Sequence, residues 1–232
     1  MEQKRTSCYA NIICRVLRVQ ALLIFDEQLA KANQKGGLIM KQKIQPKDLI
    51  TIGIFTAIMF VICMGVAMLG YIPIFIPLLS VLVPLVGGIP FMLFLTKVKK
   101  FGMVWIMSVL IALVVALMGM GVWVIVTGPV AGILADLILR SGDYKSAKKS
   151  ILGYGVFSMW LIGNYIPIVV TRDNYYSMLV SGYGQEYADT LMGYIPDWSL
   201  LPLLAACFIS GVLGALLGKA LLKKHFIRAG IA

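Results

Sequence analysis

Long uncharged runs dominate the chain. No charged residue occurs from Leu49 to Thr96 or from Phe101 to Ala135. One transmembrane helix needs about 20 apolar residues, so each of these runs can hold two helices with a turn between them. Two more apolar runs follow toward the C-terminus. The pattern therefore predicts six membrane-spanning helices, at about 49–69, 74–96, 103–118, 122–139, 151–170 and 198–222.

Glycine and proline mark the turns inside the two long runs. Gly70-Tyr71-Ile72-Pro73 divides the first run, and Gly119-Met120-Gly121 divides the second. The second predicted helix also contains Pro77, Pro84 and Pro90. We expect this helix to be kinked or interrupted, with neighbouring helices supplying partners for the freed carbonyl groups.

Positive charge lies on one side of the predicted helices. With a cytoplasmic start, the inside segments are 40–48, 97–100, 140–149 and 219–232, and they hold all but one of the fifteen Lys and Arg residues after Met40. Cytoplasmic loops of membrane proteins carry such an excess. The fold predicted is an all-α integral membrane protein, a compact bundle of six transmembrane helices with both termini cytoplasmic.

Composition supports a membrane protein and argues against several other classes. The chain is 60% hydrophobic and 13% charged, whereas soluble domains are about 25% charged. The net charge of +11 is explained by the cytoplasmic segments, so we do not expect nucleic-acid binding. There is no phosphate-binding loop, no paired intramembrane carboxylate motif and a single histidine. We therefore expect no enzymatic activity, no cofactor and no metal site.

Residues 1–39 differ from the rest of the chain. Their apolar segment, Tyr9–Phe25, is interrupted by Arg15 and Arg18 and is too short to span a membrane. An interfacial helix is one interpretation. We favour another: Lys35-Gly36-Gly37 can be encoded by a bacterial ribosome-binding sequence just before the Met40 codon. Translation would then start at Met40, and the membrane domain would comprise residues 40–232.

One acidic residue lies inside a predicted helix. Gly128, Gly132, Asp136 and Arg140 are spaced by four, so they share one face of the fourth helix. An intramembrane carboxylate is by default a functional candidate, here a coupling-ion site. The simpler interpretation is an ion pair between Asp136 and Arg140, one turn apart.

Small residues form ladders on two other helices. Gly53 and Ala57 are one turn apart on the first helix, and the last helix carries the ladders Ser210/Gly214/Gly218 and Gly211/Ala215. Such residues permit close helix packing. They either hold the bundle together or form a surface for a partner subunit, and the sequence leaves both options open.

Aromatic and polar residues gather on the predicted outer side. About half of them are expected to be interfacial anchors, and the others could form an aromatic-walled ligand pocket. An amide on an apolar helix is costly without a partner, which favours Asn164 as a ligand contact. Arg172 suits a carboxylate or phosphate. The candidate substrate-binding residues are Tyr71, Trp123, Trp160, Asn164, Tyr165, Arg172, Asn174, Tyr175 and Tyr176.

Two segments carry a resemblance to a known family. They are Lys47-Asp48-Leu49-Ile50 leading into Gly53-Ile-Phe-Thr-Ala57, and Gly128-Pro-Val-Ala-Gly-Ile-Leu-Ala-Asp136. With the six-helix layout, the chain from about Met40 onward resembles the substrate-binding (S) components of energy-coupling factor (ECF) transporters. In particular, it resembles their Trep_Strep, or MptD-type, family.

The resemblance implies a function. S components are six-helix proteins of the bacterial plasma membrane that capture a micronutrient at their outer face. They work with a transmembrane coupling subunit and two cytoplasmic ATPases. Small residues on the first helix dock on the coupling subunit, and Gly53 and Ala57 match that pattern, with glycine replacing the first alanine. Family ligands bind near the last three helices, where Trp123, Asn164 and Arg172 lie.

Three alternatives stay open. The chain could be a secondary transporter that uses Asp136 for ion coupling, a membrane enzyme acting on lipid or prenyl substrates, or a structural membrane subunit. No motif identifies a substrate. The aromatic residues and Arg172 favour a small, partly planar nutrient, with an anionic group as one option.

Overall fold

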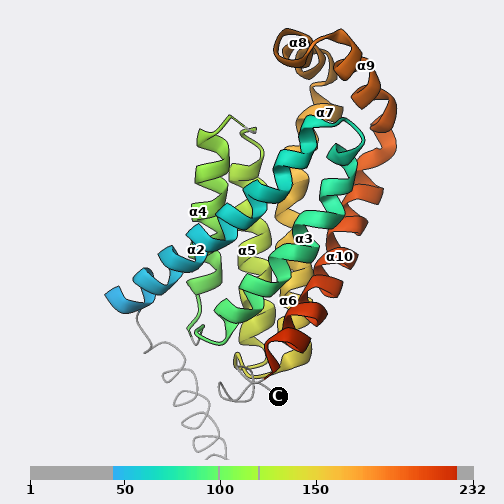
Figure 1. The fold of residues 1–232 in the computed structure, drawn as a ribbon. Coiled ribbons are helices and arrows are strands. Elements are labelled where there is room, and N and C mark those ends of the chain that lie inside the picture. The colour runs from blue at the N-terminus through green and yellow to red at the C-terminus, as the bar shows by residue number, and fades with distance from the viewer. Residues whose placement is uncertain (1–43, 99, 120, 224–232) are drawn as a thin grey trace, which may run out of the picture. The chain divides into compact units, whose positions relative to one another are not determined.

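The structure is a computed structural model that describes residues 44–98, 100–119 and 121–223, and every regular element in these ranges is helical (Figure 1). The predicted extension 1–39 and the proposed start at Met40 lie outside the described residues. The longer helices are α2 (Pro46–Ala67), α3 (Phe75–Leu95), α4 (Met103–Leu117), α5 (Val124–Arg140), α6 (Ala147–Ser158), α8 (Arg172–Tyr183), α9 (Gln185–Tyr194) and α10 (Leu200–Leu221). The shorter ones are η1 (Met68–Tyr71), η2 (Met159–Asn164), α7 (Ile166–Val170) and η3 (Asp197–Ser199).

Each of the six predicted ranges falls on helix. By length and composition, four helical stretches could cross a membrane: Pro46–Tyr71, Phe75–Leu95, Ala147–Val170 and Asp197–Leu221. Helix α4 is apolar but shorter, and α5 has 17 residues and ends in Arg140. The structure therefore supports a multi-pass helical membrane protein, and the number of six crossings stays a prediction.

Helices α3 and α10 form the tightest contact of the bundle. A Cβ atom placed on Gly214 would lie 2.5 Å from the Pro84 carbonyl oxygen, and one on Gly218 would lie 2.8 Å from the Gly88 oxygen. On the neighbouring ladder, a Cβ on Gly211 would lie 3.1 Å from the Gly155 Cα of α6. The small residues of α10 therefore pack inside the bundle, which decides between the two options left by the sequence.

Tyrosine side chains brace the proline-containing helix α3. Tyr154 donates a hydrogen bond to the Pro84 carbonyl at 2.7 Å, and Tyr165 donates one to the Ile76 carbonyl at 2.8 Å. The Ser210 hydroxyl lies 3.2 Å from the Ser80 oxygen, which loses its helical donor because proline has no N–H. Of these contacts, only that of Ser210 serves a carbonyl freed by proline, and α3 is one continuous helix rather than an interrupted one.

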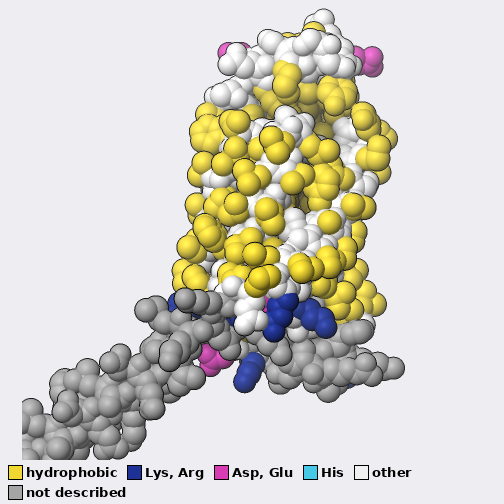
Figure 2. Space-filling view, turned by 90° about the vertical axis from the view of Figure 1, so that its left-hand side faces the viewer, with side chains coloured by type: hydrophobic (Ala, Val, Ile, Leu, Met, Phe, Trp, Pro, Cys, Tyr) yellow, Lys and Arg dark blue, Asp and Glu magenta, His cyan; other side chains and the backbone are white. Residues whose placement is uncertain are grey.

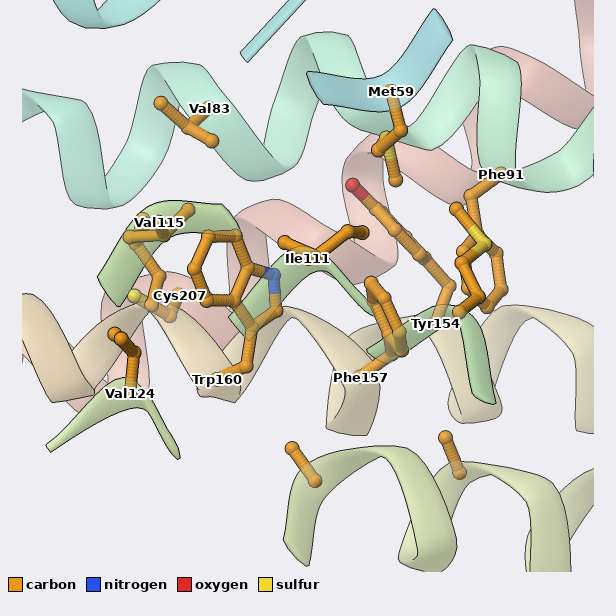
Figure 3. Close-up of a cluster of buried hydrophobic side chains, with 14 of the residues drawn as sticks. Met59, Val83, Phe91, Ile111, Val115, Val124, Tyr154, Phe157, Trp160 and Cys207 are labelled. Atoms are coloured by element: carbon orange, nitrogen blue, oxygen red, sulfur yellow. The ribbon is translucent and has the colours of Figure 1, made fainter. Parts of the chain in front are cut away.

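Aromatic rings fill the centre of the bundle (Figure 3). Phe91 of α3 lies 4.7 Å from the Tyr154 ring and 4.6 Å from the Phe157 ring, between centroids. Trp160 and Cys207 belong to the same buried cluster. This packing joins α3, the α6–η2 segment and α10 into one core.

Charge divides the two ends of the bundle (Figure 2). We call the end covered by α8 and α9 the capped end and the opposite end the basic end (Figure 1). The described charged residues at the capped end are one arginine and four acids, namely Arg172, Asp173, Glu186, Asp189 and Asp197. Most of the described lysines and arginines lie at the basic end, including Lys97, Arg140, Lys145 and Lys149. This separation matches the asymmetry that the sequence predicts.

Candidate ligand-binding and partner-docking sites

The small residues of α2 face outward. Gly53 and Ala57 are exposed, and a Cβ atom placed on Gly53 would meet no described atom within 4 Å. The same holds for Gly65, two turns beyond Ala57. With Val61, which is 68% exposed, these positions form a stripe at four-residue spacing. Gly65 was not among the predicted docking residues, although its spacing from Gly53 and Ala57 could have identified it.

Helix α2 is also the least covered of the four membrane-length stretches. In the most apolar part of the Pro46–Tyr71 stretch only 22% is buried inside the structure, compared with 56% in the corresponding part of α3. It crosses obliquely over the bundle (Figure 1). Its N-terminal end is held by Asp48, which accepts the Gln45 N–H at 2.7 Å and forms a 2.6 Å ion pair with Lys100. The helix is thus anchored at one end and presents most of its surface outward.

The candidate substrate-binding residues divide into two groups. Trp160 and Tyr165 are 7% and 3% exposed and belong to the bundle core. Tyr71, Trp123 and Asn174 are exposed, while Tyr175 and Tyr176 are partly buried in the cap. The structure therefore does not gather all of these side chains around one point.

Tyrosines join the cap to the turn between α2 and α3. The Tyr71 ring lies 6.4 Å from that of Tyr183 in α8, which stacks on Tyr187 of α9 at 4.9 Å. Tyr187 also donates a hydrogen bond to the Gly70 carbonyl. Tyr183 and Tyr187 were not among the candidate residues, because nothing local in the sequence pairs them with a turn more than a hundred residues earlier.

Arg172 has structural partners. Its guanidinium donates to the carbonyl oxygens of Ile195 at 2.7 Å and Met192 at 2.8 Å and forms a 3.1 Å ion pair with Asp197. The carbonyl groups at the end of α9 lack helical donors, so the arginine satisfies them. The predicted role of Arg172 as a cation for a ligand carboxylate or phosphate is therefore not supported by this geometry.

Replacing Arg172 with lysine is expected to loosen the cap. An ammonium group is a compact point charge and cannot reproduce the planar fork that reaches two carbonyls and a carboxylate together. Loss of two such hydrogen bonds to a charged donor should lower the local stability by about 2–3 kcal/mol. Faster backbone amide exchange in residues 185–199, with unchanged exchange in α3, would confirm that Arg172 stabilises the cap. Unchanged exchange in the cap would contradict the structural role.

Asn164 has a buried oxygen without a hydrogen-bond donor. It is the last residue of η2, a 3-10 segment inside the helical stretch from Ala147 to Val170. Its Oδ1 atom is inaccessible and accepts no hydrogen bond from any described residue. Among the candidate ligand contacts, Asn164 is thus the one whose buried polar atom the fold does not satisfy.

Asp136 is not paired with Arg140. The aspartate is fully buried, and its carboxylate accepts the Gly102 N–H at 2.8 Å, the Trp105 N–H at 3.3 Å and the Tyr144 hydroxyl at 2.7 Å. Arg140 instead lies over the Phe101 ring, 5.3 Å from its centroid. The predicted ion pair is wrong, because the N-terminus of α4 supplies the partners that a buried carboxylate requires.

The same contacts fix the two loops at the basic end. Gly102 has φ of 96°, a conformation open to glycine that turns its N–H toward Asp136. Burial, followed by the neighbouring Asp136 carboxylate, raises the pKa of Tyr144, so its hydroxyl remains a donor at neutral pH. Asp136 therefore caps α4 and joins the α3–α4 and α5–α6 loops.

Several apolar helices of membrane length, arranged around a buried aromatic core, define a multi-pass helical membrane protein. Residues 46–228 match the family described as hypothetical bacterial integral membrane protein (Trep_Strep). The chain belongs to this family. Neither a curated protein nor a solved structure matches it.

Proposed function

We propose that this protein is the substrate-capture subunit of an ATP-driven micronutrient importer in the bacterial plasma membrane. It spans the membrane six times with both termini in the cytoplasm, so the basic end is cytoplasmic and the capped end is external. A small molecule binds near the capped end. The protein docks through α2 on a transmembrane coupling subunit that works with two cytoplasmic ATPases.

The outward stripe of α2 carries this proposal. Small residues in membrane helices allow a second helix to approach closely, which is how such helices associate in lipid. The small residues of α10 are used up by contacts with α3 and α6, whereas Gly53, Ala57 and Gly65 have no partner among the described residues. A helix of another subunit would supply that partner, and energy from ATP would come through it.

The secondary-transporter alternative has less support. It requires Asp136 to bind and release a coupling ion, but both oxygens of that carboxylate accept hydrogen bonds that hold loops in place. Releasing them for ion binding would leave the α4 N-terminus and Tyr144 without partners. We therefore assign Asp136 a structural role.

Purification of the tagged full-length protein from native membranes tests the proposal. We expect a coupling subunit and two ATPases, identified by mass spectrometry, to co-purify in defined stoichiometry. Proteoliposomes containing the complex should accumulate a component of the growth medium only when ATP is enclosed with the ATPases. Uptake by this chain alone, driven by an ion gradient, would contradict the proposal and favour the secondary transporter.

A further inference from the structure

The packing of η2 against α10 places Asn164 on a defined face. Ser158, at the end of α6, donates a hydrogen bond to the Cys207 carbonyl of α10 at 2.7 Å. In a 3-10 helix, side chains three residues apart eclipse each other. Because η2 begins directly after Ser158, we expect Leu161 and Asn164 to continue the face on which Ser158 lies. Leu161 is only 7% exposed, in agreement with a face directed at the bundle.

The Ser158–Cys207 hydrogen bond also indicates which part of α10 lies opposite Asn164. From Ser158 to Asn164 the 3-10 segment rises by about 12 Å, at roughly 2.0 Å per residue. From Cys207 back toward its N-terminus, α10 covers about 12 Å in eight residues, at roughly 1.5 Å per residue. That distance ends at Ser199, the residue that precedes α10. These ideal rises lead us to expect Asn164 and Ser199, the last residue of η3, at a similar height along the two segments.

Both residues carry a buried polar atom without a partner. Ser199 is 7% exposed, and its Oγ, like the Asn164 Oδ1, forms no hydrogen bond with any described residue. The neighbouring Tyr165 hydroxyl has a carbonyl partner in α3. Burying two polar atoms without hydrogen-bond partners lowers the stability of the fold, unless a ligand binds them.

We propose that Asn164 and Ser199 form the binding site for an uncharged polar ligand that carries an N–H or O–H donor. This inference rests on the proposed function, because the ligand would be the captured substrate. The amide oxygen can only accept a hydrogen bond, so the ligand must donate one to it. The serine hydroxyl can donate or accept, and it completes the recognition of a second polar group.

The charges at the capped end define the ligand class further. Arg172 is the only cation among the described residues there, and its guanidinium binds Ile195, Met192 and Asp197. The other described charges at this end are acidic. An anionic ligand would therefore find no free counter-charge, and the anionic option left open by the sequence is replaced by a neutral ligand.

The first test measures the ligand-free protein. We compare the Tm of Asn164→Leu with that of the wild type in detergent, after growth in minimal medium and extensive washing. Removing an unsatisfied buried amide should raise the Tm by about 2–4 °C. Gln185 is an exposed amide that forms a side-chain hydrogen bond with Tyr176, so the control variant Gln185→Leu should not raise the Tm. A lower Tm for Asn164→Leu would show that the amide has a structural partner and would overturn the proposal.

The second test uses a protein-free, small-molecule filtrate of rich growth medium as the probe. The filtrate should raise the Tm of the wild type and of Gln185→Leu, but not of Asn164→Leu or Ser199→Ala. Equal shifts in all four proteins would overturn this site and leave the capture function standing. No shift in the wild type would contradict capture itself. If a buried water satisfied Asn164 in place of the substrate, the four Tm shifts would also be equal, and this site would be overturned.

Passing the filtrate over ion-exchange resins tests the ligand class. We expect the stabilising component to flow through both an anion exchanger and a cation exchanger. Retention on the anion exchanger would contradict a neutral ligand and restore the interpretation of an anionic substrate.

Discussion

Replacing Gly88 with alanine is expected to lower the Tm of the detergent-solubilised protein by about 6–12 °C, equivalent to about 3 kcal/mol. The added Cβ atom would overlap the backbone of Gly214 in α10. Because the obstacle is backbone and not the end of a flexible side chain, the two helices would have to separate. Separation would also disturb the Gly218 contact one turn away, where a Cβ atom would lie 2.8 Å from the Gly88 oxygen.

Gly65→Ala is the matched control for this prediction. It makes the same change in a helix, at a position where a Cβ atom meets no described atom within 4 Å. Alanine has a higher helix propensity than glycine, so this variant should be neutral or stabilised by up to about 1 kcal/mol. Similar Tm values for Gly88→Ala and Gly65→Ala would contradict the close crossing of α3 and α10.

The helices were predictable because their signals are local. Uncharged runs, the turn at Gly70–Pro73 and the glycines at 119–121 together predict six ranges that all fall on helix. The ladders of α10 were recognised as packing residues by their spacing. Their direction was not predictable, since the same spacing occurs on α2, where Gly53 and Ala57 face outward. Only the positions of the neighbouring helices distinguish the two cases.

The partners of the polar side chains could not be predicted, because they depend on tertiary structure. The donors to Asp136 include Gly102 and Trp105, which lie 34 and 31 residues away in the chain. Arg140, only four residues away, was the local choice and was wrong. In the same way, Arg172 binds the end of α9, in a segment that the sequence marks as polar and aromatic.

The role of Asn164 as a ligand contact stays a prediction, with one structural observation beside it. The sequence indicated Asn164 because an amide on an apolar helix requires a partner. In the structure its Oδ1 atom is buried and has no hydrogen-bond partner among the described residues. The 3-10 segment that contains it has no clear sequence signal, although Gly163 lies within this segment and Pro167 follows it. Ser199 was not among the candidate residues, because a serine before a helix is usually an N-cap.

Substituting leucine at Gly53 or Ala57 is expected to abolish uptake by the importer proposed above while ligand binding is retained. Both positions lie on the exposed face of α2, so the larger side chain should leave the bundle folded. In a close helix–helix interface, the added bulk should cost about 2 kcal/mol, which weakens association roughly 30-fold. The filtrate-induced Tm shift should stay as large as in the wild type.

Ala205→Leu provides the control for a change of the same kind elsewhere. Ala205 is an exposed small residue on α10, outside the α2 stripe, so this variant should support normal uptake and normal co-purification of the coupling subunit. Uptake that survives both Gly53→Leu and Ala57→Leu would contradict docking through α2. Loss of the filtrate-induced Tm shift in these two variants would instead indicate that the stripe contributes to ligand binding. Docking and capture would then share one surface.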